Sequence, residues 1–171
     1  MELWDIYDAK KKPTGRTMKR NDWCLKDGEY HLTVLGVITR PDGKYLITKR
    51  VMTKAWAAGW WEVSGGAGTG QESLYEAVLR EVREETGLDV SGAEGGYVFT
   101  YKRENPGEGD NYFVDVYRFT MNIKEEDLHS WCPQTPQKCP TSLAAPALLR
   151  WKPRAPSPRS QARPRWKKHP A

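Results

Sequence analysis

Hydrophobic residues fall into short segments over about the first 125 residues, and their spacing distinguishes strands from one helix. The β-branched run over residues 30–39 predicts a buried strand. Residues 40–43 favour a tight turn, so residues 44–51 are expected to return as the second strand of a hairpin. Further strands are predicted at residues 2–8, 60–63, 95–101 and 112–121. Residues 11–28 are interpreted as a turn followed by a polar connection.

One amphipathic helix is predicted from Ser73 to Thr86. Ser73 and Glu76 have the spacing of a capping box, in which each side chain accepts a hydrogen bond from the other residue's backbone N–H. Gly87 follows the last turn, where a left-handed residue is favoured, and Leu88 can pack back onto that turn. Both helix ends are therefore marked by residue chemistry as well as by periodicity.

The order of strands, helix and strands predicts an α+β or layered α/β domain. We place this domain at residues 1–130, since a chain of 171 residues has the usual length of one domain. Hydrophobic residues make up 38% of the chain, which is enough for one core.

The charge distribution separates the end of the chain from this domain. The net charge is +5, but residues 132–171 contain nine Lys or Arg, no Asp or Glu, and nine of the twelve prolines. Residues 131–171 are therefore interpreted as a basic, Pro-rich and disordered tail. Nucleic-acid binding by this tail is an open alternative, although it contains no nucleic-acid-binding motif. Because the composition changes abruptly, a frameshift after about Leu128 is a further hypothesis.

Composition also bears on the compartment. No apolar run reaches the ~18–20 residues that span a bilayer, and residues 1–5 lack the pattern of a signal peptide. The three cysteines are too few and too unevenly spaced for a disulfide framework or a zinc knuckle. We expect a cytoplasmic protein without a membrane partner.

Three acidic residues share one edge of the predicted helix. At ~100° per residue, Glu81, Glu84 and Glu85 fall within ~100° of one another. Carboxylates this close repel, and a hard divalent cation such as Mg²⁺ or Mn²⁺ removes the repulsion. Taken alone, the same acids are explained as well by a solvated face with Arg80 and Arg83 as salt-bridge partners.

A glycine-rich segment, residues 65–70, precedes the helix. It favours the cation-binding interpretation over a solvated face, because such loops let backbone groups approach phosphate oxygens. Loop and acids together follow the Nudix box: Gly, five residues, Glu, seven residues, Arg-Glu, an aliphatic residue, any residue, Glu-Glu, any residue, Gly and an aliphatic residue. Every defined position is matched, by Gly66, Glu72, Arg80, Glu81, Val82, Glu84, Glu85, Gly87 and Leu88. The sequence therefore resembles the Nudix hydrolase family. Residues 4–8 and 13–16 resemble the subgroup similar to isopentenyl-diphosphate isomerase, which has an added N-terminal hairpin.

The resemblance implies an α/β/α sandwich with a mixed sheet, in which the box forms a loop–helix–loop. It implies hydrolysis of a diphosphate linkage in a nucleoside diphosphate derivative, a small-molecule partner. It also implies an Mg²⁺ or Mn²⁺ cofactor bound by Glu81, Glu84 and Glu85, with the carbonyl of Gly66 as a candidate further ligand.

The remaining box residues receive supporting roles from the same resemblance. Arg80 would orient the glutamates through ion pairs, Glu72 would support the loop or reach the metal through water, and Gly87 would end the helix. A carboxylate would take a proton from the attacking water. Within the box, Glu84 or Glu85 is the expected base.

Two other functions stay open. Isopentenyl-diphosphate isomerases of this family use a Cys in the strand region before the box. Residues 30–51 contain none, and Cys24 lies ahead of them, which argues against that activity. A non-catalytic Nudix ligand-binding module would be favoured by loss of a box glutamate, and none is lost. The sequence assigns neither substrate-binding residues nor an oligomeric state.

Several residues outside the box have both a structural and a functional interpretation. Glu104 and Glu108 are candidate bases or solvated loop charges, and Lys49 and Arg50 are candidate phosphate contacts or a solvated strand end. Trp60 and Trp61 could stack on a base, although one of them is expected in the core, and His31 is expected to be a strand histidine with its polar atoms satisfied.

Overall fold

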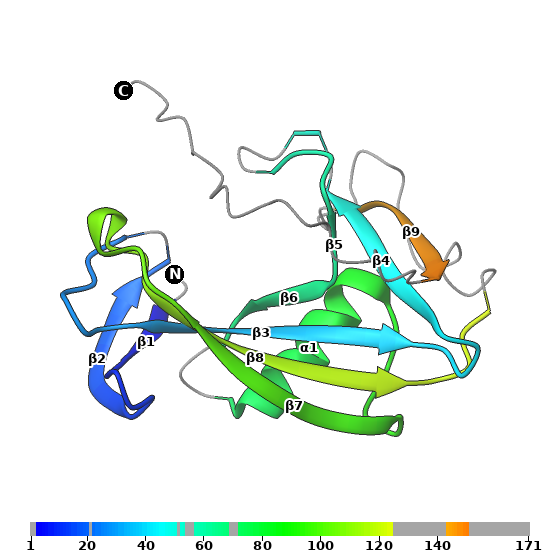
Figure 1. Cartoon of the computed structure of the whole chain (residues 1–171), viewed down its shortest axis with the longest axis horizontal. Helices are drawn as coiled ribbons and strands as arrows, with labels where there is room; N and C mark the ends of the chain where they lie inside the picture. The colour runs from blue at the N-terminus through cyan, green and yellow to red at the C-terminus, as the bar shows by residue number, and fades with distance from the viewer. Residues whose placement is uncertain are drawn as a thin grey trace, which may run out of the picture.

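The computed structural model describes residues 3–20, 22–50, 52–53, 57–68, 72–124 and 143–150, the last of these by its backbone course. These residues form two β-sheets and one α-helix (Figure 1). The elements in chain order are β1 (Leu3–Tyr7), β2 (Pro13–Lys19), β3 (His31–Thr39), β4 (Lys44–Arg50), β5 (Trp61–Glu62), β6 (Ser64–Ala67), α1 (Leu74–Thr86), β7 (Glu94–Arg103), the short 3-10 helix η1 (Pro106–Glu108), β8 (Tyr112–Thr120) and β9 (Leu143–Arg150).

The main sheet is mixed, as predicted. Its strand order is β5-β4-β3-β8-β7, with β6 also paired to β3 and β9 to β4. Strands β3 and β8 run parallel, whereas the other pairs are antiparallel. Within the described ranges α1 is the only α-helix, so the second helical layer of an α/β/α sandwich is not part of them. The same ranges contain no helix long and apolar enough to cross a bilayer.

The predicted β3–β4 hairpin forms, but its two strands soon separate. Arg40 donates its backbone N–H to Lys44 across a turn in which Gly43 has φ +80°. The ladder contains the pair Thr39↔Tyr45, after which β6 takes the place beside β3. Residues 65–67, which were expected to begin a glycine-rich loop, belong to strand β6, so this expectation was wrong for them.

The core lies between one face of the sheet and α1. Ala77, Val78 and Val82 of the helix are fully buried in one cluster with residues of β3 and β8. The helix approaches closely because β3 has a glycine beneath it: a Cβ added to Gly36 would lie 2.5 Å from Val82 Cγ2. This close packing fixes the height of α1 above the sheet.

Strand β1 confirms the strand predicted at residues 2–8, whereas β2 forms where a turn and a polar connection were expected. Together they make an N-terminal hairpin, as the subgroup resemblance implies. This hairpin forms a separate two-stranded sheet beside the start of β3 (Figure 1). A small buried cluster joins it to the end of β6, and the members of this cluster are Trp4, Ile6, Met18, Leu25 and Ala67. The turn between β1 and β2 also carries Lys11, whose ammonium contacts the buried carboxylate of Asp115 in β8.

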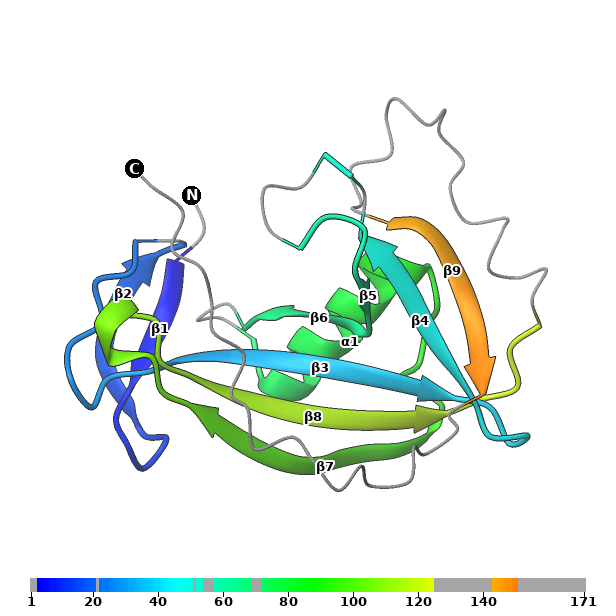
Figure 2. The same ribbon diagram turned by 45° about the horizontal axis from the view of Figure 1, so that its top comes forward.

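Strand β9 belongs to the segment expected to be an irregular tail. It pairs antiparallel with β4, from Lys44↔Arg150 to Arg50↔Leu143, and lies beside β4 in both views (Figures 1 and 2). Residues 143–150 thus differ from the expectation. Residues 131–142 and 151–171, together with the proposed frameshift point near Leu128, lie outside the described residues. The domain boundary at residue 130 stays a prediction.

Candidate active site

The helix that carries the acidic residues begins and ends as its sequence predicts. The Ser73 hydroxyl accepts the Glu76 N–H at 3.2 Å, and Glu76 Oε2 accepts the Ser73 N–H at 2.8 Å. Gly87 has φ +76° and donates its N–H to the carbonyl of Arg83 at 2.9 Å. The two caps fix where the helix begins and ends, and its acidic edge lies between them.

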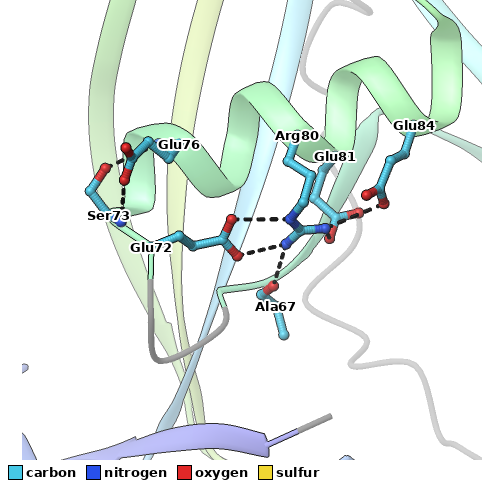
Figure 3. A network of polar contacts seen from close by, with 7 residues as sticks. All are labelled: Ala67, Glu72, Ser73, Glu76, Arg80, Glu81 and Glu84. Carbon is cyan, nitrogen blue, oxygen red and sulfur yellow. Dashed lines mark hydrogen bonds and ion pairs between the residues drawn. The ribbon is translucent and has the colours of Figure 1, made fainter. Parts of the chain in front are cut away.

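Arg80 is the centre of the polar network at this edge (Figure 3). Its Nε and Nη2 donate side-on to the two carboxylate oxygens of Glu72, at 3.0 and 2.8 Å. Its Nη1 donates to Glu81 Oε1 at 2.7 Å and to Glu84 Oε2 at 3.3 Å, and Nη2 also reaches the carbonyl of Ala67 at 3.3 Å. Five contacts match the five N–H groups of a guanidinium, so Arg80 acts as an internal organiser of the acids. The hydrogen bond with Glu72 is the largest cause of a raised pKa at Arg80.

Glu85 lies on the other side of the edge, against β6. Its Oε2 accepts the backbone N–H of Gly65 at 3.1 Å. Burial, followed by the negative charge of Glu81, raises the pKa of Glu85 to about 7; the charge of Glu62 adds to this, while hydrogen bonds from Gly65 and Ser64 act against it. A carboxylate this strongly destabilised in its ionised form is common at functional sites.

Gly66 makes room for Glu81. A Cβ added to Gly66 would lie 2.4 Å from Glu81 Oε1 and 2.5 Å from its Cδ. Any side chain at this position would therefore displace the carboxylate. Glycine is needed here because β6 and α1 approach each other closely, and not because the backbone has a positive φ.

The structure brings some predicted site residues together and separates others. Glu72, Glu81 and Glu84 share the guanidinium of Arg80, whereas Glu85 faces Gly65. Among the described residues, no three acidic, His or Cys side chains converge closely enough to hold a metal ion in this conformation. The donor set nevertheless fits a hard divalent cation in its chemistry, because it consists of carboxylates beside a glycine backbone.

The residues considered outside the box have other partners. Glu104 accepts hydrogen bonds from Tyr30 at 2.6 Å and binds Lys102 at 2.8 Å. His31 is buried, stacks on Trp4, and lies 3.1 Å from Asp110 through Nε2, whereas its Nδ1 has no partner among the described residues.

Both tryptophans before the box are exposed. Trp60 is 57% exposed and Trp61 is 51% exposed, so the expectation that one of them lies in the core was wrong.

Sequence reasoning missed Glu62 as a member of this region. Glu62 Oε2 pairs with Arg50 Nη1 at 2.9 Å, and its charge acts on Glu85. The signal available in the sequence was its place three residues before Gly65, directly ahead of the box. Nothing local, however, linked it to Arg50.

Comparison with known proteins agrees with this geometry. A family model described as the NUDIX domain matches residues 29–146. An uncharacterized Nudix hydrolase of Listeria monocytogenes is 30% identical over 133 residues, covering 75% of this chain and 76% of the relative. The CTP pyrophosphohydrolase of Escherichia coli is 31% identical over 119 residues, or 68% of this chain and 84% of that protein. Isopentenyl-diphosphate Δ-isomerase of Escherichia coli is also related, at 29% identity over 74% of each chain.

A solved structure supports the fold. The crystal structure of DR0079 from Deinococcus radiodurans superposes with a TM-score of 0.64 at 18% identity, over 87% of this chain and 83% of that one. Because the family model spans well over half of the sequence and includes the whole box, the chain belongs to the Nudix hydrolase family.

Proposed function

We propose that this protein hydrolyses a diphosphate linkage in a nucleoside diphosphate derivative and requires Mg²⁺ or Mn²⁺. The observation that carries the proposal is the gathering of Glu72, Glu81 and Glu84 on one arginine, beside the partly buried Glu85. Carboxylates placed this close together repel one another, whereas a divalent cation that also binds substrate phosphates requires them as ligands.

Four groups would hold the cation: the carboxylates of Glu81, Glu84 and Glu85 and the backbone carbonyl of Gly66. A divalent cation at this place neutralises charge on a diphosphate and lowers the pKa of a bound water. Arg80 keeps Glu81 and Glu84 oriented, and the Gly65 N–H keeps Glu85 oriented. These contacts limit the positions that the acids can take when a cation brings them together.

We assign the proton transfer from the attacking water to Glu84. Its side chain is 57% exposed, so it is open to a substrate, while Glu85 is only partly exposed and accepts the Gly65 N–H. A base must reach the proton that it accepts. The sequence left Glu84 and Glu85 as equal candidates, and exposure separates them.

The isomerase relative makes isomerisation of isopentenyl diphosphate the second candidate. The described strands β3 and β4 contain no Cys, and Cys24 is an exposed free thiol ahead of them. This arrangement lacks the Cys expected opposite the glutamates and favours hydrolysis.

We place the reaction in the cytosol, because the cysteine content suits a reducing compartment.

A substrate panel tests the proposal. The full chain is incubated with Mg²⁺ and with nucleoside triphosphates, dinucleoside polyphosphates, ADP-ribose-type compounds and isopentenyl diphosphate, and the products are separated. We expect phosphate-containing products that disappear in Glu84→Gln and Glu85→Gln, whereas Glu94→Gln, an exposed acid on β7, keeps full turnover. Unchanged turnover in both site variants would contradict the assignment, and binding without turnover would favour a ligand-binding module.

A further inference from the structure

Strand β7 lies at one edge of the main sheet (Figures 1 and 2). Among the described strands it pairs only with β8, so no described strand lies along its other side. At ten residues it is also the longest strand that the structure describes. A long edge with one open side can pair with a strand of another chain, and most proteins protect such edges.

The usual protection, a charge in the middle of the strand, is missing from β7. Its centre instead carries apolar and aromatic side chains that are between 43% and 57% exposed: Tyr97, Val98, Phe99 and Tyr101. Its charges lie near the two ends, with Glu94 at the start and Lys102 and Arg103 at the finish. Exposed aromatic residues flanked by charges are typical of the centre and the rim of a protein interface.

A β-bulge lies close to the middle of β7. The register with β8 shifts between Tyr97 and Phe99, so Val98 is the extra residue. A bulge often prevents edge pairing, because it interrupts the ladder. Here it leaves a regular segment on each side, residues 94–97 and residues 99–103, and each segment keeps its pairing with β8.

The two segments present their side chains to the same two faces of the sheet. Phe113, Tyr117 and Phe119 of β8 belong to the core with α1, so the β8 residues that alternate with them point to the opposite face. Side chains directly opposite each other in a ladder share a face. The β7 residues that therefore point away from α1 are Glu94, Gly96, Phe99, Tyr101 and Arg103.

This arrangement makes β7 complementary to a second copy of itself. A two-fold axis midway between Val98 and Phe99 places Glu94 of each copy opposite Arg103 of the other, and Gly96 opposite Tyr101. Each pair shares one face of the sheet, because the bulge lies at the axis and affects both copies equally. A slip by one residue would instead set side chains of opposite faces against each other.

The pairs formed in this register also suit each other chemically. Glu94 meets the opposite charge of Arg103, whose Nη1 donates to the Tyr112 hydroxyl at 2.9 Å and so stays on that face. A Cβ on Gly96 would meet nothing within 4 Å, which leaves space for the Tyr101 ring of the second copy. Exposed ion pairs add little affinity but select the register. A parallel arrangement would place Arg103 beside Arg103 and lose them.

We propose that β7 is the interface of a two-fold symmetric dimer, in which a second copy of this chain adds its β7 antiparallel to the first. The two main sheets then form one continuous sheet, with both α1 helices on the same face. Such an interface uses the same surface of both copies, as closed two-fold dimers do. The inference does not depend on the proposed function.

Sedimentation equilibrium of the full chain over a range of concentrations measures the dissociation constant of the dimer. The variants are Val98→Lys, Glu94→Arg, Arg103→Glu and the charge-exchanged Glu94→Arg/Arg103→Glu. Arg83→Glu is the matched control, since it reverses an exposed charge on α1 and alters the net charge as Arg103→Glu does. Thermal unfolding checks that each variant is folded, and hydrogen exchange of the β7 amides at low and high protein concentration reports on the strand itself.

We expect each single charge reversal to raise the dissociation constant by about tenfold or more, because it creates two like-charge pairs in one dimer. The charge-exchanged variant should return to within about threefold of the wild type, since both pairs are restored with their charges exchanged. Val98→Lys should raise the constant by about 10²-fold, because it brings two ammonium groups together near the axis. Arg83→Glu should behave as the wild type, and the β7 amides should exchange more slowly at high concentration.

A chain that is monomeric at every concentration up to about 1 mM would overturn the inference, as would a dimer that Val98→Lys leaves intact. A folded charge-exchanged variant that dimerises no better than the single reversals would also overturn it. Protection of the β7 amides that is equal at all concentrations would show that other residues of the same chain cover the strand, which contradicts pairing with a second copy.

Discussion

The carboxylate of Glu72 binds the guanidinium of Arg80 side-on, with Nε–Oε2 and Nη2–Oε1 distances of 3.0 and 2.8 Å (Figure 3). Glu72 stands before α1, whereas Arg80 lies in the second turn of the helix. Their contact ties the segment ahead of the helix to its middle and turns Nη1 toward Glu81 and Glu84. The positions of Glu81 and Glu84, two proposed cation ligands, thus depend on Glu72, which holds the Arg80 guanidinium in place.

Replacing Arg80 by Lys is expected to uncouple these acids. Lysine has no planar fork, so it cannot bind Glu72 side-on and contact Glu81 and Glu84 at the same time. We expect kcat/KM to fall by about 10²-fold, the usual result of displacing catalytic groups by ~1 Å. Steady-state kinetics measure this loss. Arg83→Lys is the control, since Arg83 is an exposed residue of the same helix, and an equal loss in both variants would contradict the special role of Arg80.

A methyl group at Gly66 is expected to impair function more than folding. The added Cβ would meet the carboxylate of Glu81, the far end of a flexible side chain that can swing away at small cost. Gly66→Ala should therefore lower the unfolding free energy by about 1 kcal/mol or less, yet weaken Mn²⁺ binding and turnover at least tenfold. Electron paramagnetic resonance of added Mn²⁺ and kinetics measure these effects. Gly92→Ala, where a Cβ meets nothing within 4 Å, should change neither.

The sequence predicted the helix well because its boundaries depend on local chemistry. Ser73, Glu76 and Gly87 act within one turn of each helix end, and the structure shows each of their contacts. The hairpin turn at residues 40–43 is equally local. The Nudix box combines such local signals with fixed spacing, which is why family and fold were identified without coordinates.

Elements that depend on distant partners were missed for the same physical reason. In β2 only Met18 is buried, so the strand has no hydrophobic period and exists because β1 pairs with it. β6 consists mostly of glycine and small residues and forms because β4 leaves the edge of β3. Arg50 and Glu62 meet only through the pairing of β4 and β5. Tertiary context, rather than propensity, decides each of these cases.

Loss of Lys11 is expected to weaken the packing of the N-terminal hairpin against the main sheet. Lys11 contacts Asp115, whose side chain is 3% exposed, and donates to Thr100 Oγ1 at 3.2 Å. Lys11→Met leaves a buried carboxylate without its cation, so we expect the unfolding free energy to fall by about 2–4 kcal/mol. Denaturant unfolding measures this loss, and Lys10→Met, an exposed neighbour, is the control. Lys11→Met combined with Asp115→Asn should recover part of the stability; no recovery would show that the charge of Asp115 is not the cause.

The raised pKa of Glu85 predicts a stability that depends on pH in metal-free protein. The folded state holds the proton of Glu85 up to about pH 7, because the side chain is buried beside Glu81 and Glu62, whereas the unfolded chain releases it near 4.5. Between these values the folded state binds more protons, so this group lowers stability as pH rises and exerts its full effect above about pH 7. Glu85→Gln removes the effect and should be more stable than the wild type by up to about 3 kcal/mol at pH 8 in EDTA, and nearly equal to it at pH 4.5. Thermal unfolding across this pH range measures the difference, with Glu94→Gln as control. If Glu85→Gln is less stable than the wild type at pH 8, the ionised Glu85 is not destabilised by its surroundings. Added Mg²⁺ should stabilise the wild type more than the variant, because only the wild type has the carboxylate at this position to bind the cation.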